Sequence, residues 1–330
     1  MPYRSHRPDR REFVRAAAAG LAALPALGLR DVERLLAARR SRVALVRTSD
    51  RRRGVADALK LLQPASVKGR QVVVKPNFNT ADDAPGSTHN DTLSQIVVEM
   101  FERGARTVTV GESSGPPETR GVMEKKGILD LARDLRFGVV DFEQIPEADW
   151  VSFPSAGTHW PDGFALPRLV VKSEYTVSTC CLKTHGFGGV FTMSLKLAVG
   201  LTPKAIRRGM HRSPDMRRMI AELNTGYKPD LIVLDGVAAF TDGGPTRGVL
   251  KPGNVIIAGD DRIAVDAVGV AMLKSLGANE AIMSRGVFQQ EQIARAVELG
   301  LGVSDADSID IVTGDAESRA CADQLRKLLA

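Results

Sequence analysis

The stretch "YTVSTCCLKTHGFGGVFTMSLKLAVG" (175–200) joins an apolar run, a glycine turn and a cluster of cationic and hydroxyl side chains. Its first eight residues (175–182) are apolar and β-branched, which is typical of a strand covered on both faces in a parallel sheet. Lys183, Thr184 and His185 follow where this strand is expected to end. The segment after the glycines supplies three more polar side chains, Thr192, Ser194 and Lys196. We therefore expect a buried strand that delivers polar groups to one edge of a sheet.

The same kind of strand recurs along the chain, separated by helical patterns. Further strands are expected at 43–47, 71–75, 107–111, 137–142, 230–236, 254–259 and 308–314. Helices are expected at 54–62, 90–104, 119–135, 213–225, 262–276, 289–300 and 316–329. This alternation predicts a three-layer α/β fold with a largely parallel sheet. One segment, 150–171, is rich in proline, glycine and aromatic residues and predicts a small inserted hairpin or lobe.

The first forty residues differ from the rest in composition. Arg10 and Arg11 precede Phe13 and a run of small apolar residues, an order that resembles a twin-arginine export signal. The run is shorter than the ~20 residues that a membrane span needs. We therefore expect residues 1–40 to be a signal and linker, and residues 41–330 to be the folded domain. This predicts an exported, periplasmic or extracytoplasmic protein that meets the twin-arginine machinery and has no stable membrane span.

Composition argues against several other classes of protein. Of the 330 residues only 5% are aromatic, and much of the net charge of +6 comes from arginines in the first 42 residues. Both features disfavour nucleic acid as a partner. The three cysteines (Cys180, Cys181 and Cys321) form no CxxC pattern. We therefore expect neither a disulfide framework nor an iron–sulfur cluster.

Polar residues gather where the expected strands end. Ligands bind open parallel sheets in the crevice at the carboxyl ends of the strands, and loops there commonly carry function. The residues in these positions are Lys75, Asn77, Asn79, Glu112, Ser113, Lys183, Thr184, His185, Asp235 and Asp261. Stretches expected nearby add Lys196, Arg207, Arg208, His211 and the glycines Gly243 and Gly244. We interpret this set as a candidate binding site.

The charges of this set need an explanation. Two like charges about 4 Å apart repel by roughly 4 kcal/mol at an effective dielectric constant near 20. If Lys75, Lys183 and Lys196 converge, opposite charge must offset the repulsion. It comes either from an internal ion network with Glu112, Asp235 or Asp261, or from a carboxylate or phosphate of a bound ligand.

His185 and His211 are the candidates for proton transfer, because histidine titrates near neutral pH. The alternative is that they bind a divalent metal together with Asp235 or Glu112. A third interpretation of either histidine is a hydrogen-bonded loop residue without chemistry.

The motif blocks, taken in order, resemble a known family. The blocks are "KPNFN", "VTVGESSG", "CLKTHGFGGVFTMSLKLAVGLTP", "MH", "DLIVLDGVAAFTDGGPTRG" and "VIIAGDDRIAVDAV". Together they are similar to those of the DUF362 family over about residues 43–315. Many members carry ferredoxin-like cysteine motifs, which this chain lacks, so a cluster is not carried over. The chain also departs at Leu197, where the family usually has asparagine. By position, the resemblance carries over Lys75, Asn77, Glu112, Lys183, His185, Lys196, His211, Asp235 and Asp266.

We therefore expect an exported α/β protein with a cationic pocket that binds a small anionic compound and acts on it. Lys183 and Lys196 would hold the anionic group, and a histidine, oriented by Asp235 or Glu112, would move a proton. The alternative is a non-catalytic periplasmic binding protein, or an accessory partner of a redox or iron–sulfur system. An exposed apolar patch near 150–170 would favour a redox protein partner.

Overall fold

The computed structural model describes residues 40–330 of the protein. The expected signal and linker, 1–40, lies outside this part except for Arg40. Among the described residues, no helix combines the length and the apolar character needed to cross a membrane.

One large sheet organises the fold. Its strands lie in the order β11-β1-β10-β9-β7-β2-β3-β4, and β8 pairs with β7. The pairs are parallel, except those that β10 makes with β1 and β9 and that β8 makes with β7. The bounds are β1 (Ser41–Arg47), β2 (Gln71–Lys75), β3 (Thr107–Glu112), β4 (Gly138–Asp141), β7 (Tyr175–His185), β8 (Val190–Thr192), β9 (Leu231–Gly243), β10 (Gly248–Gly259) and β11 (Ile309–Val312).

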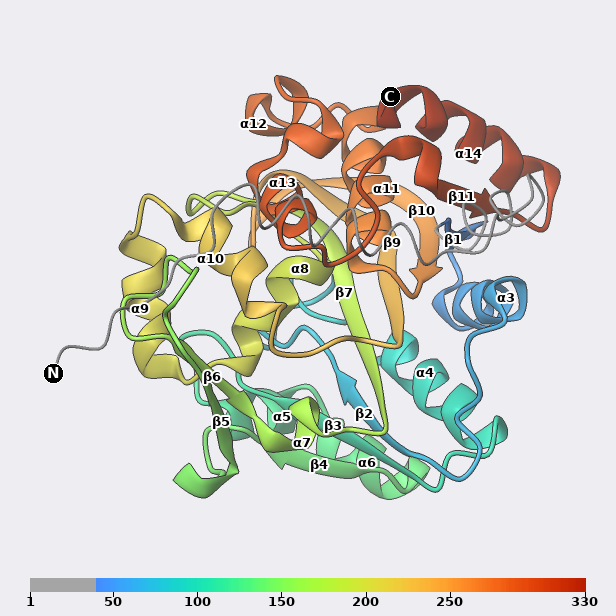
Figure 1. The fold of residues 1–330 in the computed structure, drawn as a ribbon. Coiled ribbons are helices and arrows are strands. Elements are labelled where there is room, and N and C mark those ends of the chain that lie inside the picture. Colours follow the sequence, from blue (N-terminus) through green and yellow to red (C-terminus); the bar gives the residue numbers. More distant parts are fainter. Residues whose placement is uncertain (1–39) are drawn as a thin grey trace, which may run out of the picture. The chain divides into compact units, whose positions relative to one another are not determined.

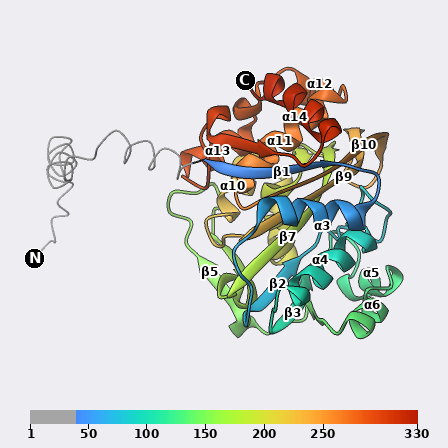
Figure 2. The ribbon, with the colours of Figure 1, turned by 90° about the vertical axis from the view of Figure 1, so that its right-hand side faces the viewer.

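Helices cover both faces of the sheet. Alternate strand residues enter different cores: Val43 and Leu45 pack in one, Ala44 and Val46 in the other. Figure 2 shows α3 and α4 in front of the strands. The face of the sheet that packs Ala44 and Val46 is covered by α3 (Arg51–Leu62), α4 (Asn90–Glu102), α5 (Thr119–Lys125) and α6 (Ile128–Leu135). The opposite face is covered by α8 (Ser194–Leu197), α10 (Met216–Leu223), α11 (Arg262–Ser275), α13 (Glu291–Glu298) and α14 (Ala316–Leu329). The predicted three-layer α/β fold is confirmed.

The segment 150–171 forms the predicted hairpin. Strands β5 (Trp150–Phe153) and β6 (Phe164–Pro167) pair antiparallel, apart from the large sheet, and α7 (Arg168–Val171) follows (Figure 1). Within this segment, Leu169 is the one exposed large apolar side chain, at 37% exposure. The segment therefore presents no apolar patch of the kind that would favour a redox partner.

Two strands depart from the prediction in ways that change the site. Strand β7 continues to His185, because β8 pairs with its last residues, so Lys183 and Thr184 lie within the strand. Strand β10 runs against its neighbours. The residues that follow it therefore leave the sheet at the edge opposite to the one where β2, β3 and β7 end.

The helix predicted at 119–135 is divided into α5 and α6 at Gly127, which has a positive φ of 67°.

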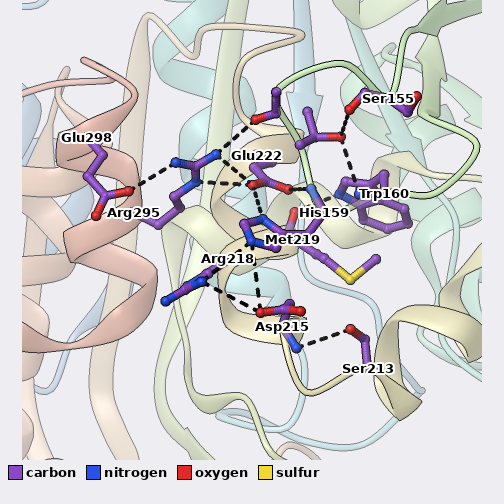
Figure 3. A network of polar contacts seen from close by, with 12 residues as sticks. Ser155, His159, Trp160, Ser213, Asp215, Arg218, Met219, Glu222, Arg295 and Glu298 are labelled. Carbon is purple, nitrogen blue, oxygen red and sulfur yellow. Dashed lines mark hydrogen bonds and ion pairs between the residues drawn. The ribbon is translucent and has the colours of Figure 1, made fainter.

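A buried carboxylate fastens the hairpin to the helices beside it. Glu222 of α10 is fully buried and accepts hydrogen bonds from the backbone N–H of His159 (2.8 Å) and from Arg295 of α13 (2.9 Å). The Nδ1 atom of His159 lies 2.6 Å from the same carboxylate. Figure 3 shows His159 and Arg295 converging on Glu222 from two different segments.

We expect Glu222→Gln to lower the free energy of unfolding by about 3 kcal/mol, because it leaves the Arg295 guanidinium without its buried partner. Urea denaturation followed by circular dichroism measures the loss. Glu298→Gln is the matched control: Glu298 also pairs with Arg295, but its side chain is 64% exposed, so the loss should stay below about 1 kcal/mol. Equal losses in the two variants would contradict the assignment.

Candidate functional site

A cavity of about 770 Å³ opens where β2, β3 and β7 end, and α8 and α9 (Lys204–Arg212) complete its wall. The predicted site residues that line it are Lys75, Asn77, Asn79, Glu112, Ser113, His185, Lys196 and His211. Arg207 and Arg208, both expected nearby, line it as well. Among its lining residues Glu112 is the one carboxylate. The cavity is therefore strongly cationic.

The Glu112 carboxylate is already engaged by the protein. Lys75 Nζ lies 2.5 Å from Glu112 Oε1 and donates to the carbonyl of Pro76 (2.6 Å). Glu112 also accepts from the backbone N–H groups of Phe78 (2.7 Å) and Ser113 (2.8 Å). Burial lowers the pKa of Lys75, against the opposing effect of Glu112. Glu112 therefore neutralises Lys75 and, contrary to expectation, orients no histidine.

Arg207 is a fixed positive charge in the wall of the cavity. Its guanidinium donates to the carbonyls of Thr202, Ser113 and Ser114 and to the Ser113 hydroxyl. These bonds occupy all five of its N–H groups. It forms no ion pair within residues 40–330, and burial lowers its pKa to about 10. Arg207 thus contributes charge to the cavity and holds its wall, with no N–H left for a ligand.

Lys196 differs from the other buried cations because its amine is unengaged. The residue is only 7% exposed, and within residues 40–330 its Nζ atom makes no hydrogen bond or ion pair. Burial lowers the pKa of Lys196 to about 7, and the charges of Lys183 and Arg207 act in the same direction. Asp266 fixes the short helix that carries it by accepting from the N–H groups of Ser194 (2.7 Å) and Leu195 (2.9 Å).

The two histidines have complementary ring nitrogens. The N–H of Gly189 donates to His185 Nδ1 (3.2 Å), so a neutral His185 carries its proton on Nε2. His211 Nδ1 lies 2.8 Å from the carbonyl oxygen of Arg207. Since a carbonyl only accepts, His211 Nδ1 carries the proton and its Nε2 is free to accept one. The ring centroids are 6.2 Å apart.

Both imidazoles are biased toward the neutral form. Burial, followed by the charge of Lys196, lowers the pKa of His185 to about 2. Burial also lowers the pKa of His211, while its hydrogen bond to the Arg207 carbonyl acts in the opposite direction. At neutral pH the pocket therefore offers an N–H donor at His185 and a proton acceptor at His211. Backbone groups orient the rings, in place of the carboxylates expected from the sequence.

Lys183 and Thr184 support the wall of the cavity. Lys183 is fully buried and donates to the carbonyls of Gly86 (2.6 Å) and Pro245 (3.1 Å). The Thr184 hydroxyl lies 3.1 Å from the carbonyl of Gly243. These bonds hold the loop whose Pro245 and Thr246 line the cavity. Lys183 does not line the cavity, although the sequence predicted that it would hold the anionic group of a ligand.

Glycine at 243 and 244 lets this loop approach β7 closely. Both residues have positive φ angles, 76° and 75°. A Cβ atom on Gly244 would clash with the Thr184 carbonyl oxygen, far inside van der Waals contact. The two glycines shape the cavity wall but do not line the cavity.

Asp235 and Asp261 lie away from the cavity, so their expected roles are wrong. Asp235 pairs with Arg51 (2.8 Å) and accepts from the Thr92 hydroxyl (2.7 Å), on the face covered by α3 and α4. Asp261 caps α11 by accepting from the N–H groups of Ile263 and Ala264. The reversed direction of β10 places it at the far edge of the sheet. Within residues 40–330, no three His, Cys, Asp or Glu side chains are grouped to hold a metal ion.

Helix α9 and Lys204 at its start were not predicted. Lys204 lines the cavity and lies 2.8 Å from Glu143 Oε1. The available signal was Pro203, since proline is favoured at helix starts. The many cationic residues after it masked the apolar periodicity of the helix.

Comparisons with known proteins find a sequence relative and more distant solved structures. A thylakoid-associated protein of Synechocystis sp. is 25% identical over 242 residues, which cover 68% of this chain and 72% of that protein. Among solved structures, the lactate racemase apoprotein of Thermoanaerobacterium thermosaccharolyticum aligns over 86% of this chain and 85% of its own, at a TM-score of 0.45 and 11% identity. A Thermotoga maritima protein aligns over 61% of this chain at a TM-score of 0.38 and 14% identity, and the chain spans about half (52%) of its length.

The family profile of a domain of unknown function, DUF362, matches residues 72–271. This span contains nearly all of β2, the whole of β3 and β7, and helices α8 and α9, and every lining residue of the cavity falls within it. The resemblance seen in the sequence is confirmed, and the chain belongs to the DUF362 family.

Proposed function

We propose that the protein binds a small anionic compound in this cavity and acts on it by proton transfer. The observation that carries the proposal is the imbalance of charge. Within residues 40–330, Lys196 and Arg207 are buried at the cavity without a carboxylate partner, while Glu112 is neutralised by Lys75. Buried charge is expensive unless it is paired. A carboxylate or phosphate group of a ligand supplies the missing counter-charge.

The histidines define what the site does to its ligand. A neutral His185 donates from Nε2 and a neutral His211 accepts at Nε2, so the pocket can protonate one atom of a ligand while it deprotonates another. The donor groups left for the anion are the amine of Lys196 and the exposed guanidinium of Arg208.

The twin-arginine pair, Arg10 and Arg11, extends the proposal to an exported protein that acts outside the cytoplasm.

Calorimetric titration with inorganic phosphate and with oxalate tests the binding. We expect saturable binding that Lys196→Met weakens about tenfold or more, because a charge-assisted hydrogen bond contributes about 1.5–3 kcal/mol. Lys274→Met is the control: this lysine is partly exposed, donates to the Met283 carbonyl and does not line the cavity. It removes the same unit of charge and should leave the affinity unchanged. No saturable binding, or equal weakening by both substitutions, would overturn the proposal.

Proton transfer is tested without knowledge of the product. In D₂O, exchange of a carbon-bound hydrogen of a bound anion is visible by proton NMR. We expect a candidate such as pyruvate to exchange faster with the protein than without it. His211→Gln should remove the acceleration while oxalate affinity is retained. Retained exchange in this variant would exclude His211 as the acceptor.

A further inference from the structure

Three lysines are buried at or beside the cavity, and they differ in what their nitrogen atoms contact. Lys75 has Glu112 and the Pro76 carbonyl, and Lys183 has two backbone carbonyls. Within residues 40–330, Lys196 Nζ has no such partner, although its side chain lines the cavity. A buried ammonium group demands acceptors, whereas a neutral amine does not. The surroundings of Lys196 therefore suit a free amine with a lone pair that faces the cavity.

The amine is also held in place, as a nucleophile must be. Asp266 accepts from two consecutive N–H groups at the start of α8, and the Asn224 side chain donates to the Leu195 carbonyl (3.0 Å). Lys196 then extends past Gly189. A Cβ atom placed on Gly189 would lie 2.8 Å from His185 Nδ1 and 2.9 Å from Lys196 Cε. The absence of a side chain there lets the lysine and the imidazole lie against each other.

Two further groups beside the amine can serve a carbonyl oxygen. His185 presents a neutral Nε2–H, as its bond from Gly189 requires. The Thr192 hydroxyl is buried, has no hydrogen-bond partner within residues 40–330, and belongs to the cavity wall. Such an unpaired polar group is unusual inside a protein. The site thus combines an amine, two O–H or N–H donors and an anion-attracting field.

We propose that the Lys196 amine forms an imine with the carbonyl carbon of a small anionic aldehyde or ketone. The proposal rests on the proposed function and names the substrate class of the same cavity. The nitrogen lone pair adds to the carbonyl carbon and forms a C–N bond. The two amine protons and the carbonyl oxygen then leave as one water molecule, so that C=O is replaced by C=N with no change in oxidation state. With its pKa lowered to about 7, Lys196 populates both forms at neutral pH: the ammonium that attracts an anion and the free amine that adds to a carbonyl.

His185 and His211 have defined parts in this step. The Nε2–H of His185 donates to the carbonyl oxygen and stabilises the charge that develops on it. His211 Nε2 accepts a proton that the amine releases. The Arg207 charge attracts the anionic group of the ligand but donates no hydrogen bond to it. These roles use only groups that line the cavity.

Reductive trapping tests the imine. The probe is pyridoxal 5′-phosphate, an anionic aldehyde, added at one equivalent to the full protein and followed by sodium borohydride. We expect intact mass spectrometry to show addition of one pyridoxyl phosphate group, and peptide mapping to place it on Lys196. Excess inorganic phosphate should protect the lysine. A label spread over other lysines, or none, would overturn the inference.

Two variants separate the amine from its charge. Lys196→Arg keeps a positive charge but cannot form an imine, so it should bind phosphate and lose the label. Lys274→Met should keep both. If phosphate binding depends on Lys196 and the wild-type protein is not labelled, the imine proposal fails and the anion site stands. If phosphate does not bind either, the proposed function fails as well.

Discussion

Gly200→Ala is expected to lower the free energy of unfolding by about 3–5 kcal/mol, because the new methyl group meets the buried Lys75–Glu112 pair. Its Cβ atom would lie 2.7 Å from Lys75 Nζ and 2.9 Å from Glu112 Oε1. Both residues are almost fully buried, at 1% exposure, and held by further backbone bonds. Neither can move aside without leaving a charged group partly unpaired.

Chemical denaturation of the wild type and of two glycine variants measures this loss. Gly209→Ala, within α9, is the matched control, since a Cβ atom there meets nothing within 4 Å. That substitution should stabilise the protein by about 1 kcal/mol, through helix propensity. If Gly200→Ala is as stable as the control, the pair is not confined as the structure describes.

The sequence was sufficient for the layers of the fold because strand and helix patterns are local. The apolar runs at 71–75 and 107–111 form β2 and β3, and the last residues of these strands, Lys75 and Glu112, form one ion pair. Strand direction is not local. A run such as 254–259 reads the same in either direction, so its reversal in β10 could not be anticipated, and Asp261 was assigned to the wrong edge.

The partners of charged side chains could not be predicted from the sequence either. Asp235 follows its apolar run as Glu112 does, yet a register shift beside Cys181 lets β9 continue, and Arg51 of α3 takes the carboxylate. Lys183 and Lys196 look alike in the sequence, but carbonyls bind the Lys183 amine, whereas the Lys196 amine has no partner in the described part of the chain. Such differences depend on loops that meet only in the folded chain. They decide which lysine is available for chemistry.

Lys196→Met is expected to stabilise the protein, and more strongly at low pH. Burial lowers the pKa of Lys196 from its usual 10.5 to about 7. Between these values the unfolded chain binds more protons than the folded one, so the wild type gains stability as the pH rises. Below about pH 7 both states are protonated and the full penalty applies. Each pKa unit corresponds to about 1.4 kcal/mol, so Met should add about 5 kcal/mol at pH 6 and about 2 kcal/mol at pH 9.

Urea denaturation of the wild type and the variant at both pH values gives the difference directly, because the titration of other groups largely cancels. Lys204→Met serves as the control on the same cavity: its side chain is 30% exposed and paired with Glu143, so its removal should bring no gain. A gain for Lys196→Met that is equal at the two pH values would mean that the amine is not perturbed. A gain that shrinks as the pH rises identifies Lys196 as the uncompensated charge, at the same position where an anion or a carbonyl compound is expected to bind.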